Sequence, residues 1–260
     1  MATKLTILGC GGSMGVPLVG DVWRACDPNE PKNFRMRPSI WVKSDTTSII
    51  VDTGQDFRMQ TVKYKIETLD AVLYTHAHSD HVNGIDDVRP YTFRAKKQMP
   101  AFMNKATYDE LMRRFNYVLV ETDPLYPVLV APQVWDEDAY YNEQQIGDII
   151  YTPFPQQHGN IESIGFRFGN IGYSTDMTNL ADASIEALKG IDTWIVDGGA
   201  GMNDMITVHA SYSRVIDLNK RIGAKQVFLT HLTAGQDYQT LLKELPQGYA
   251  PAYDGLEFTL

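Results

Sequence analysis

The feature that most constrains the fold of this chain is a cluster of histidine and aspartate residues directly after an apolar strand pattern. Residues 71–75 have the composition of a buried strand. Three histidines and an aspartate follow within six residues: His76, His78, Asp80 and His81. The chain contains six histidines, so half of them lie here. Because α/β proteins bind ligands where their strands end, the segment predicts an α/β protein with a site at a sheet edge.

The spacing within the cluster favours metal binding. His76 and His78 are two residues apart, so both face the same way in an extended segment. Asp80 and His81 follow a turn of the chain and can reach a second metal. Imidazole and carboxylate ligands together suit zinc, manganese or iron. The alternative interpretation is an ordinary polar surface loop.

Three further candidate ligands each come at or after a predicted strand. They are His158 after 151–154, Asp176 after 171–174 and His231 after 226–230. A single histidine in such a place is more often a hydrogen-bonded structural residue. Three suitable residues at three strand ends, together with the cluster, favour a metal centre.

The rest of the chain alternates strand and helix patterns, which predicts two sheets with helices outside. Further strands are expected at 3–8, 40–42, 48–51, 163–168, 193–196 and 256–260. Helices are expected at 57–65, 103–117, 180–188, 211–221 and 241–245. We expect a single domain, 1–260, with an irregular insertion or lid at about 119–148 that has some strand content.

A glycine-rich loop runs from Gly9 to Pro17 and matches neither a Walker loop nor a dinucleotide fingerprint. It is either a tight turn or a wall of the active site. Residues 21–38 are polar and contain proline, which indicates a loop.

The bulk properties exclude some functions. A formal net charge of −9 argues against broad binding to DNA or RNA. It does not exclude a small anionic substrate, because bound metals can reverse the local field. Cys10 and Cys26 are too few for a disulfide framework, and the sequence shows no signal-peptide or membrane-span pattern. We therefore expect a cytoplasmic protein that does not interact with membranes.

The segment from Thr75 to His81 reads Thr-His-x-His-x-Asp-His and resembles the hallmark of the metallo-β-lactamase superfamily. The resemblance implies an αββα sandwich of two mixed β-sheets flanked by helices. It is closer to one branch, the PhnP-like phosphoribosyl cyclic phosphate phosphodiesterases. The matching pieces are Gly9 to Pro17, Arg37-Pro38, Thr75 to Gly84 with Arg89, Ser174 to Asp176, His209, Thr230-His231 and Asp254-Gly255.

The resemblance implies two divalent metal ions, zinc or manganese, and a ligand set. One metal would be held by His76, His78 and His158, the other by Asp80, His81 and His231, with Asp176 between them. The implied activity is a metal-dependent phosphodiesterase. It would hydrolyse a small cyclic or nucleotide-like phosphodiester with a water that the metals activate.

Four residues carry further expected roles. His209 resembles a general acid that also contacts substrate, although a helix-capping neighbour without chemistry is the alternative. Asp80 is expected to take part in catalysis as well as metal binding. Asp52 either supports a ligand histidine or caps a turn. Arg89 either binds a terminal phosphate or forms an exposed salt bridge.

The sequence departs from that branch at a second zinc site near the first loop. The corresponding positions are Asp21, Trp23, Cys26 and Ala234, and a single thiolate cannot complete a tetrahedral site. We expect no structural zinc and a loop held by ordinary packing, with Trp23 as a candidate.

Other functions on the same scaffold stay open. They are a thioesterase or lactamase, a tRNA 3′-end processing nuclease, and a non-catalytic small-molecule-binding protein. The sequence shows no basic arm for tRNA. A homodimer is compatible with the sequence, but no segment requires one.

Overall fold

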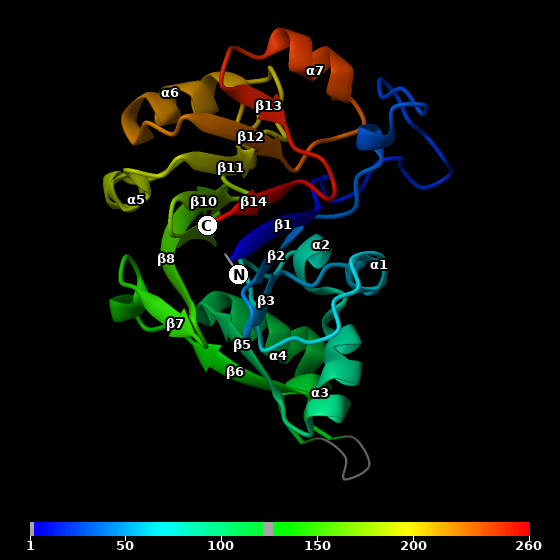
Figure 1. Cartoon of the computed structure of the whole chain (residues 1–260), viewed down its shortest axis with the longest axis vertical. Coiled ribbons are helices and arrows are strands. Elements are labelled where there is room, and N and C mark those ends of the chain that lie inside the picture. Colours follow the sequence, from blue (N-terminus) through cyan, green and yellow to red (C-terminus); the bar gives the residue numbers. More distant parts are fainter. Residues whose placement is uncertain (1–2, 122–126) are drawn as a thin grey trace.

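The computed structural model describes residues 3–121 and 127–260. Two seven-stranded sheets face each other in this part of the chain, and helices cover their outer surfaces (Figure 1). This arrangement is the predicted αββα sandwich of two mixed sheets. No helix among the described residues is long and apolar enough to cross a bilayer.

The first sheet has the order β14-β1-β2-β3-β4-β5-β6. Its strands are β1 (Lys4–Gly9), β2 (Ser39–Lys43), β3 (Ser48–Val51), β4 (Ala71–Leu73), β5 (Met99–Met103), β6 (Val130–Val134) and β14 (Glu257–Thr259). Strands β3 to β6 run parallel, and the others pair antiparallel. The last strand, β14, lies beside β1, which brings the two ends of the chain together (Figure 1).

The second sheet has the order β13-β12-β11-β10-β9-β8-β7. Its strands are β7 (Gln144–Ile146), β8 (Ile149–His158), β9 (Ile161–Phe168), β10 (Ile171–Ser174), β11 (Thr193–Asp197), β12 (Gln226–Thr230) and β13 (Tyr249–Pro251). Strands β10 to β13 run parallel. Their carboxyl ends therefore meet at one edge of the sheet, as such strands do in ligand-binding α/β folds.

The helices divide between the outer faces of the two sheets (Figure 1). The first half of the chain contributes α1 (Phe57–Lys63), α2 (Ser79–Val82), α3 (Arg89–Ala95) and α4 (Lys105–Leu119). The second half contributes α5 (Asp182–Leu188), α6 (Tyr212–Ile222) and α7 (Tyr238–Glu244). Short 3-10 helices lie at Pro31–Asn33, Ile85–Val88 and Glu137–Ala139.

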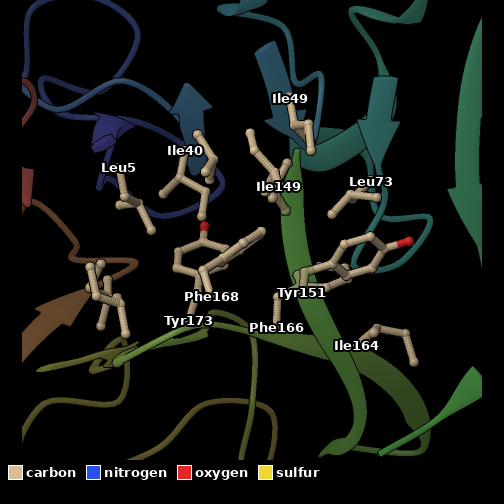
Figure 2. Packing of buried hydrophobic residues seen from close by; sticks show 14 of the residues in the cluster. Leu5, Ile40, Ile49, Leu73, Ile149, Tyr151, Ile164, Phe166, Phe168 and Tyr173 are labelled. Atoms are coloured by element: carbon tan, nitrogen blue, oxygen red, sulfur yellow. The ribbon is translucent and has the colours of Figure 1, made fainter. Parts of the chain in front are cut away.

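The central core fills the space between the sheets, where each strand points alternate side chains inward (Figure 2). The aromatic rings of Tyr151, Phe166 and Phe168 form a cluster with centroids 6.2 Å apart. Aliphatic side chains from the first sheet, including Ile40 and Leu73, pack in the same core. Each such buried side chain contributes about 1.5–3 kcal/mol, which makes the sheets a rigid support for the loops at their edge.

The interpretation of 119–148 as an irregular insertion needs correction. Strand β6 extends the parallel part of the first sheet by pairing with β5. Strand β7 forms the edge of the second sheet by pairing with β8. The segment therefore completes both sheets, although it does have the expected strand content. Residues 122–126 of that predicted insertion lie outside the described residues.

Several elements differ from the sequence prediction. Strand β8 runs on to His158, so this histidine ends the strand instead of following it. The prediction missed α2, α3, β5 and β13. Strand β5 was missed because Met99–Met103 contains a proline, and its burial depends on strands that are distant in sequence.

Candidate metal centre

The fold brings all seven predicted ligands together at one edge of the sandwich. His76 and His78 follow β4, whereas Asp80 and His81 lie on the single turn of α2. His158 ends β8, Asp176 follows β10 and His231 follows β12. All of these side chains are buried except that of His78, which is exposed. The site is therefore open to solvent on the side of His78.

The seven residues fall into two groups that share one aspartate. In each group the candidate ligand atoms lie within 4.8 Å of one another. The groups are His76, His78, His158 and Asp176, and Asp80, His81, His231 and Asp176. They are the two ligand sets that the resemblance implied.

The two carboxylate oxygens of Asp176 face different groups. Its Oδ1 lies 3.6 Å from Nε2 of His158, which itself lies 3.2 Å from Nδ1 of His78. Its Oδ2 lies 3.0 Å from Nε2 of His81 and 3.3 Å from Nε2 of His231. Asp176 therefore presents a separate carboxylate oxygen to each of the two groups.

These spacings fit divalent metal binding. Two donors bound to one zinc at 2.0–2.1 Å in a tetrahedral arrangement lie about 3.4 Å apart. Asp80 Oδ2 lies 3.3 Å from His81 Nε2 and 3.4 Å from His231 Nε2. In addition, Nε2 of His76 is buried and has no hydrogen-bond partner among the described residues. A buried polar atom without any partner destabilises the folded state, and a bound cation would supply a partner here.

Ionisation of the histidines is consistent with this fit. Burial lowers the pKa of His76 well below its usual value, and partial desolvation of the exposed His78 lowers its pKa as well. Both imidazoles are therefore neutral, as metal ligands must be. Burial also opposes protonation of His231, but the carboxylates of Asp176 and Asp80 raise its pKa to about 9. In the absence of a metal, this half of the site attracts a proton instead.

Unusual backbone geometry orients several of these side chains. The φ values of Asp52, Asp176 and His231 are 65°, 48° and 58°. They lie in the left-handed region, which residues other than glycine rarely adopt. Non-glycine residues in this region cluster at functional sites. A Cβ atom on Gly54 would lie 2.0 Å from the carbonyl oxygen of Asp80, so only glycine allows this close approach.

Asp52 supports the ligand histidines from behind. Its Oδ2 accepts a hydrogen bond from Nδ1 of His81 at 2.7 Å and one from the Thr75 hydroxyl at 2.9 Å. The Thr75 hydroxyl also lies 3.0 Å from Nδ1 of His76. Of the two roles considered for Asp52, the structure shows the contact with a predicted ligand histidine. These bonds leave Nε2 of both imidazoles facing the centre.

His209 lies beside the two groups, and its half-buried ring stacks on that of His231 at 4.4 Å. Its Nδ1 lies 2.8 Å from Oδ2 of Asp197, the last residue of β11. Asp197 is held in turn by the backbone N–H groups of Met177 and Gly199. Sequence reasoning missed Asp197, although an aspartate that ends the apolar strand β11 was the available signal.

The glycine-rich loop lies against the centre as well as forming a turn. The Gly12 N–H donates to the carbonyl of Leu232, and the Leu232 N–H donates to the carbonyl of Cys10. A Cβ atom on Gly12 would lie 3.3 Å from Nδ1 of His231. The loop therefore forms part of the wall around His231.

Three of the four positions that correspond to the second zinc site lie in an apolar cluster. Cys26 and Ala234 are buried with Val16, and Trp23 packs against them. The Trp23 indole donates to Asp21 at 2.8 Å. This is the ordinary packing that the sequence predicted for the loop.

The structure places Arg89 in a salt bridge. Its Nη2 lies 3.1 Å from Oδ1 of Asp86, and both side chains are at least one-third exposed. This contact matches the second of the two interpretations of Arg89. Its binding of a substrate phosphate stays a prediction.

Comparisons with known proteins agree with this geometry. The model of the beta-lactamase superfamily domain matches residues 47–232. The crystal structure of a new diphosphatase from the PhnP family is 31% identical, with a TM-score of 0.87 over 100% of this chain and 98% of that one. YhfI from Bacillus subtilis, a metallo-beta-lactamase fold protein, is 19% identical, with a TM-score of 0.72 over 98% of both chains.

A curated relative from Porphyromonas gingivalis carries a different name, octanoyltransferase. It is 31% identical over 257 residues, which is 98% of this chain. The chain spans about half of that relative, 51% of its length. Human tRNase Z, short form, shares the fold at 17% identity, with a TM-score of 0.69 over 98% of both chains. From its motifs, its fold and these matches, the chain belongs to the beta-lactamase superfamily and, within it, to the PhnP family.

Proposed function

We propose that this protein is a metal-dependent phosphoric diester hydrolase that acts on a small nucleotide-like or sugar-phosphate substrate. One observation carries the proposal. Two four-residue groups share Asp176, and His209 stacks against one of their histidines. Two divalent ions, zinc or manganese, are the cofactors that this donor set suits.

When bound, the ions would supply Lewis acidity for the phosphoryl group and lower the pKa of an attacking water. The chain would hold them with His76, His78 and His158 on one side and with Asp80, His81 and His231 on the other, while Asp176 contributes to both. Asp80 also stays a candidate catalytic residue, because its Oδ2 faces both His81 and His231.

His209 is placed to move a proton. Its Nδ1–H donates to Asp197, so Nε2 is the nitrogen that remains for the substrate. When water adds to phosphorus, the bond from phosphorus to the leaving oxygen breaks, and that oxygen needs a proton. We assign its delivery to Nε2 of His209, and the carboxylate of Asp197 fixes the orientation of the imidazole ring.

A small substrate fits the charge of the chain and its relatives. The net charge of −9 disfavours a long nucleic acid. The 31% identical relative is described as a diphosphatase. A diphosphate diester and a cyclic phosphodiester both have phosphorus bonded to a leaving oxygen, so one site can accept either. We therefore include both in the proposed substrate class.

The test is a substrate panel with the purified protein loaded with zinc or with manganese. It contains bis(p-nitrophenyl) phosphate, a cyclic nucleotide, ADP-ribose, a tRNA precursor and an octanoyl thioester. Faster hydrolysis of the small phosphorus compounds supports the proposal. Faster reaction of the tRNA precursor contradicts the proposal. Faster reaction of the octanoyl thioester also contradicts it; this substrate is included because one relative is named octanoyltransferase.

A further inference from the structure

A cavity of about 600 Å³ opens beside the candidate metal centre. This volume lies within the range of about 300–1,000 Å³ that is common for small-molecule sites. Its walls come from residues 76–79, which we call the ligand segment, from α4, and from the turn between β8 and β9 together with the start of β9. The lining residues include His76, His78, Glu110, Arg114, Asn160 and Glu162.

Arg114 connects α4 to the ligand segment. Its Nη1 donates to the carbonyl of Ala77 at 2.6 Å, and Ala77 is the residue between His76 and His78. Its Nη2 donates to Oδ1 of Asn83 at 2.5 Å and to the hydroxyl of Ser79 at 3.4 Å. The guanidinium is therefore fixed next to two of the candidate metal ligands.

None of the hydrogen-bond partners of Arg114 is charged. All three acceptors are neutral oxygens, and none of the described carboxylates forms a salt bridge with Arg114. A guanidinium has five N–H donors, so these contacts leave two for a ligand. The neighbouring Arg113 differs, because Glu110 pairs with it through both carboxylate oxygens at 2.5 and 3.0 Å.

The other walls of the cavity do not attract anions. Glu162 lies near the start of β9, where the amide of Asn104 approaches it at 3.5 Å. Asn160 is neutral. Among the described lining residues, Arg114 is therefore the cation that is free to meet an anionic group beside the metal centre.

We infer that Arg114 binds a second phosphoryl group of the substrate and makes this enzyme favour substrates that carry one. The inference rests on the proposed function and narrows it to diphosphate diesters and phosphorylated sugars or nucleotides. The two N–H groups that remain are Nε–H and one on Nη1, and each of them can donate a charge-assisted hydrogen bond to a phosphate oxygen. Arg114 also positions the ligand segment through Ala77, so the test must separate the two roles.

The experiment compares two substrates across four proteins. The substrates are ADP-ribose, which has two phosphoryl groups, and the p-nitrophenyl ester of thymidine 5′-monophosphate, which has one. The proteins are the wild type, Arg114→Met, Arg114→Lys and the control Arg113→Met. The quantity of interest is the kcat/KM value for ADP-ribose divided by that for the p-nitrophenyl ester. Loss of metal would lower both kcat/KM values, so the metal content of each protein is measured as well.

We expect Arg114→Met to lower the ratio of kcat/KM for ADP-ribose to kcat/KM for the p-nitrophenyl ester by roughly tenfold to a hundredfold. This is the range for a lost charge-assisted hydrogen bond. Arg114→Lys should restore part of the ratio, mainly through KM, and Arg113→Met should leave it unchanged. An equal loss with both substrates would make Arg114 a brace for the ligand segment and overturn the inference.

The remaining outcomes also decide the matter. If the wild type cleaves the p-nitrophenyl ester and not ADP-ribose, the proposed function stands and the inference is wrong. If the wild type cleaves neither substrate with either metal, the proposed function fails and the inference fails with it.

Discussion

The carboxylate of Asp197 lies 2.8 Å from Nδ1 of His209, at the end of strand β11. The same carboxylate accepts two backbone N–H bonds, so it is fixed before any substrate arrives. An anchored carboxylate selects the tautomer of the imidazole that it contacts and orients its ring. In the proposed mechanism, Asp197 is a positioning residue that acts through His209.

Replacing His209 tests this relationship. His209→Ala should keep its metals and lose about 10²–10⁴-fold in kcat, the usual contribution of a general acid. Asp197→Asn should keep its metals and show a smaller loss in kcat, because the ring loses its fixed tautomer and orientation. Metal analysis and steady-state kinetics check both variants. Loss of metal from His209→Ala would make His209 a ligand instead.

Asp52 should set metal affinity, because its carboxylate holds Nδ1 of His81 at 2.7 Å. Asp52→Ala is expected to weaken metal binding by about 10–100-fold, as is typical for partners of ligand histidines. Competition with a chromophoric chelator measures this. The matched control is Asp109→Ala, an exposed acidic residue on α4. If Asp52→Ala kept the metal affinity of the wild type, Asp52 would only cap a turn.

Metal removal should destabilise the fold around the centre. Asp80 and Asp176 are both buried there, and without a cation their charges face each other and the imidazoles. A ligand present at a thousand times its Kd stabilises by about 4 kcal/mol. Chelation should therefore lower Tm by roughly 10 °C, and added zinc should restore it. If the chelator left Tm unchanged, this would contradict metal binding at the site.

The stability of the protein should also carry a pH dependence from Asp254. Burial raises its pKa to about 7, although N–H groups of Met36 and Cys10 oppose the shift. The unfolded value is about 3.9, so this group contributes stability below about pH 4 that is lost as pH rises through about 7.

Asp254→Asn removes this titration. The variant should be less stable than the wild type, because an amide replaces a hydrogen-bond acceptor of Cys10 or Met36. The difference should shrink from pH 5 to pH 8, by at most about 1.4 kcal/mol per pH unit. Urea unfolding at several pH values measures it, and a constant difference would contradict the shifted ionisation.

Local sequence signals were sufficient to predict the two-layer fold and the residues that gather at its edge. His76, His78, Asp80 and His81 lie in one short segment, and each distant partner lies at the end of an apolar strand. Family resemblance, and not spacing, divided them into two sets. The structure then placed the members of each set within 4.8 Å of one another.

Features that depend on contacts between distant segments could not be predicted. Strands β6 and β7 pair only at the edges of the sheets, so their sequences lack a strong alternating pattern and suggested an insertion. Arg114 was one of several charged residues on a helix, and only the fold brings it to Ala77. Asp197 was hidden for the same reason, because its partner His209 lies in the loop before α6.

The central claim is that one chain binds two divalent ions at a centre shared by Asp176. Its most direct test is the metal content of protein that has been loaded with zinc or manganese and freed of excess ion. We predict two bound ions per chain in the wild type and none at the apolar cluster of Cys26 and Ala234. Asp176→Asn should weaken the binding of both ions. One ion or none in the folded wild type would contradict the account.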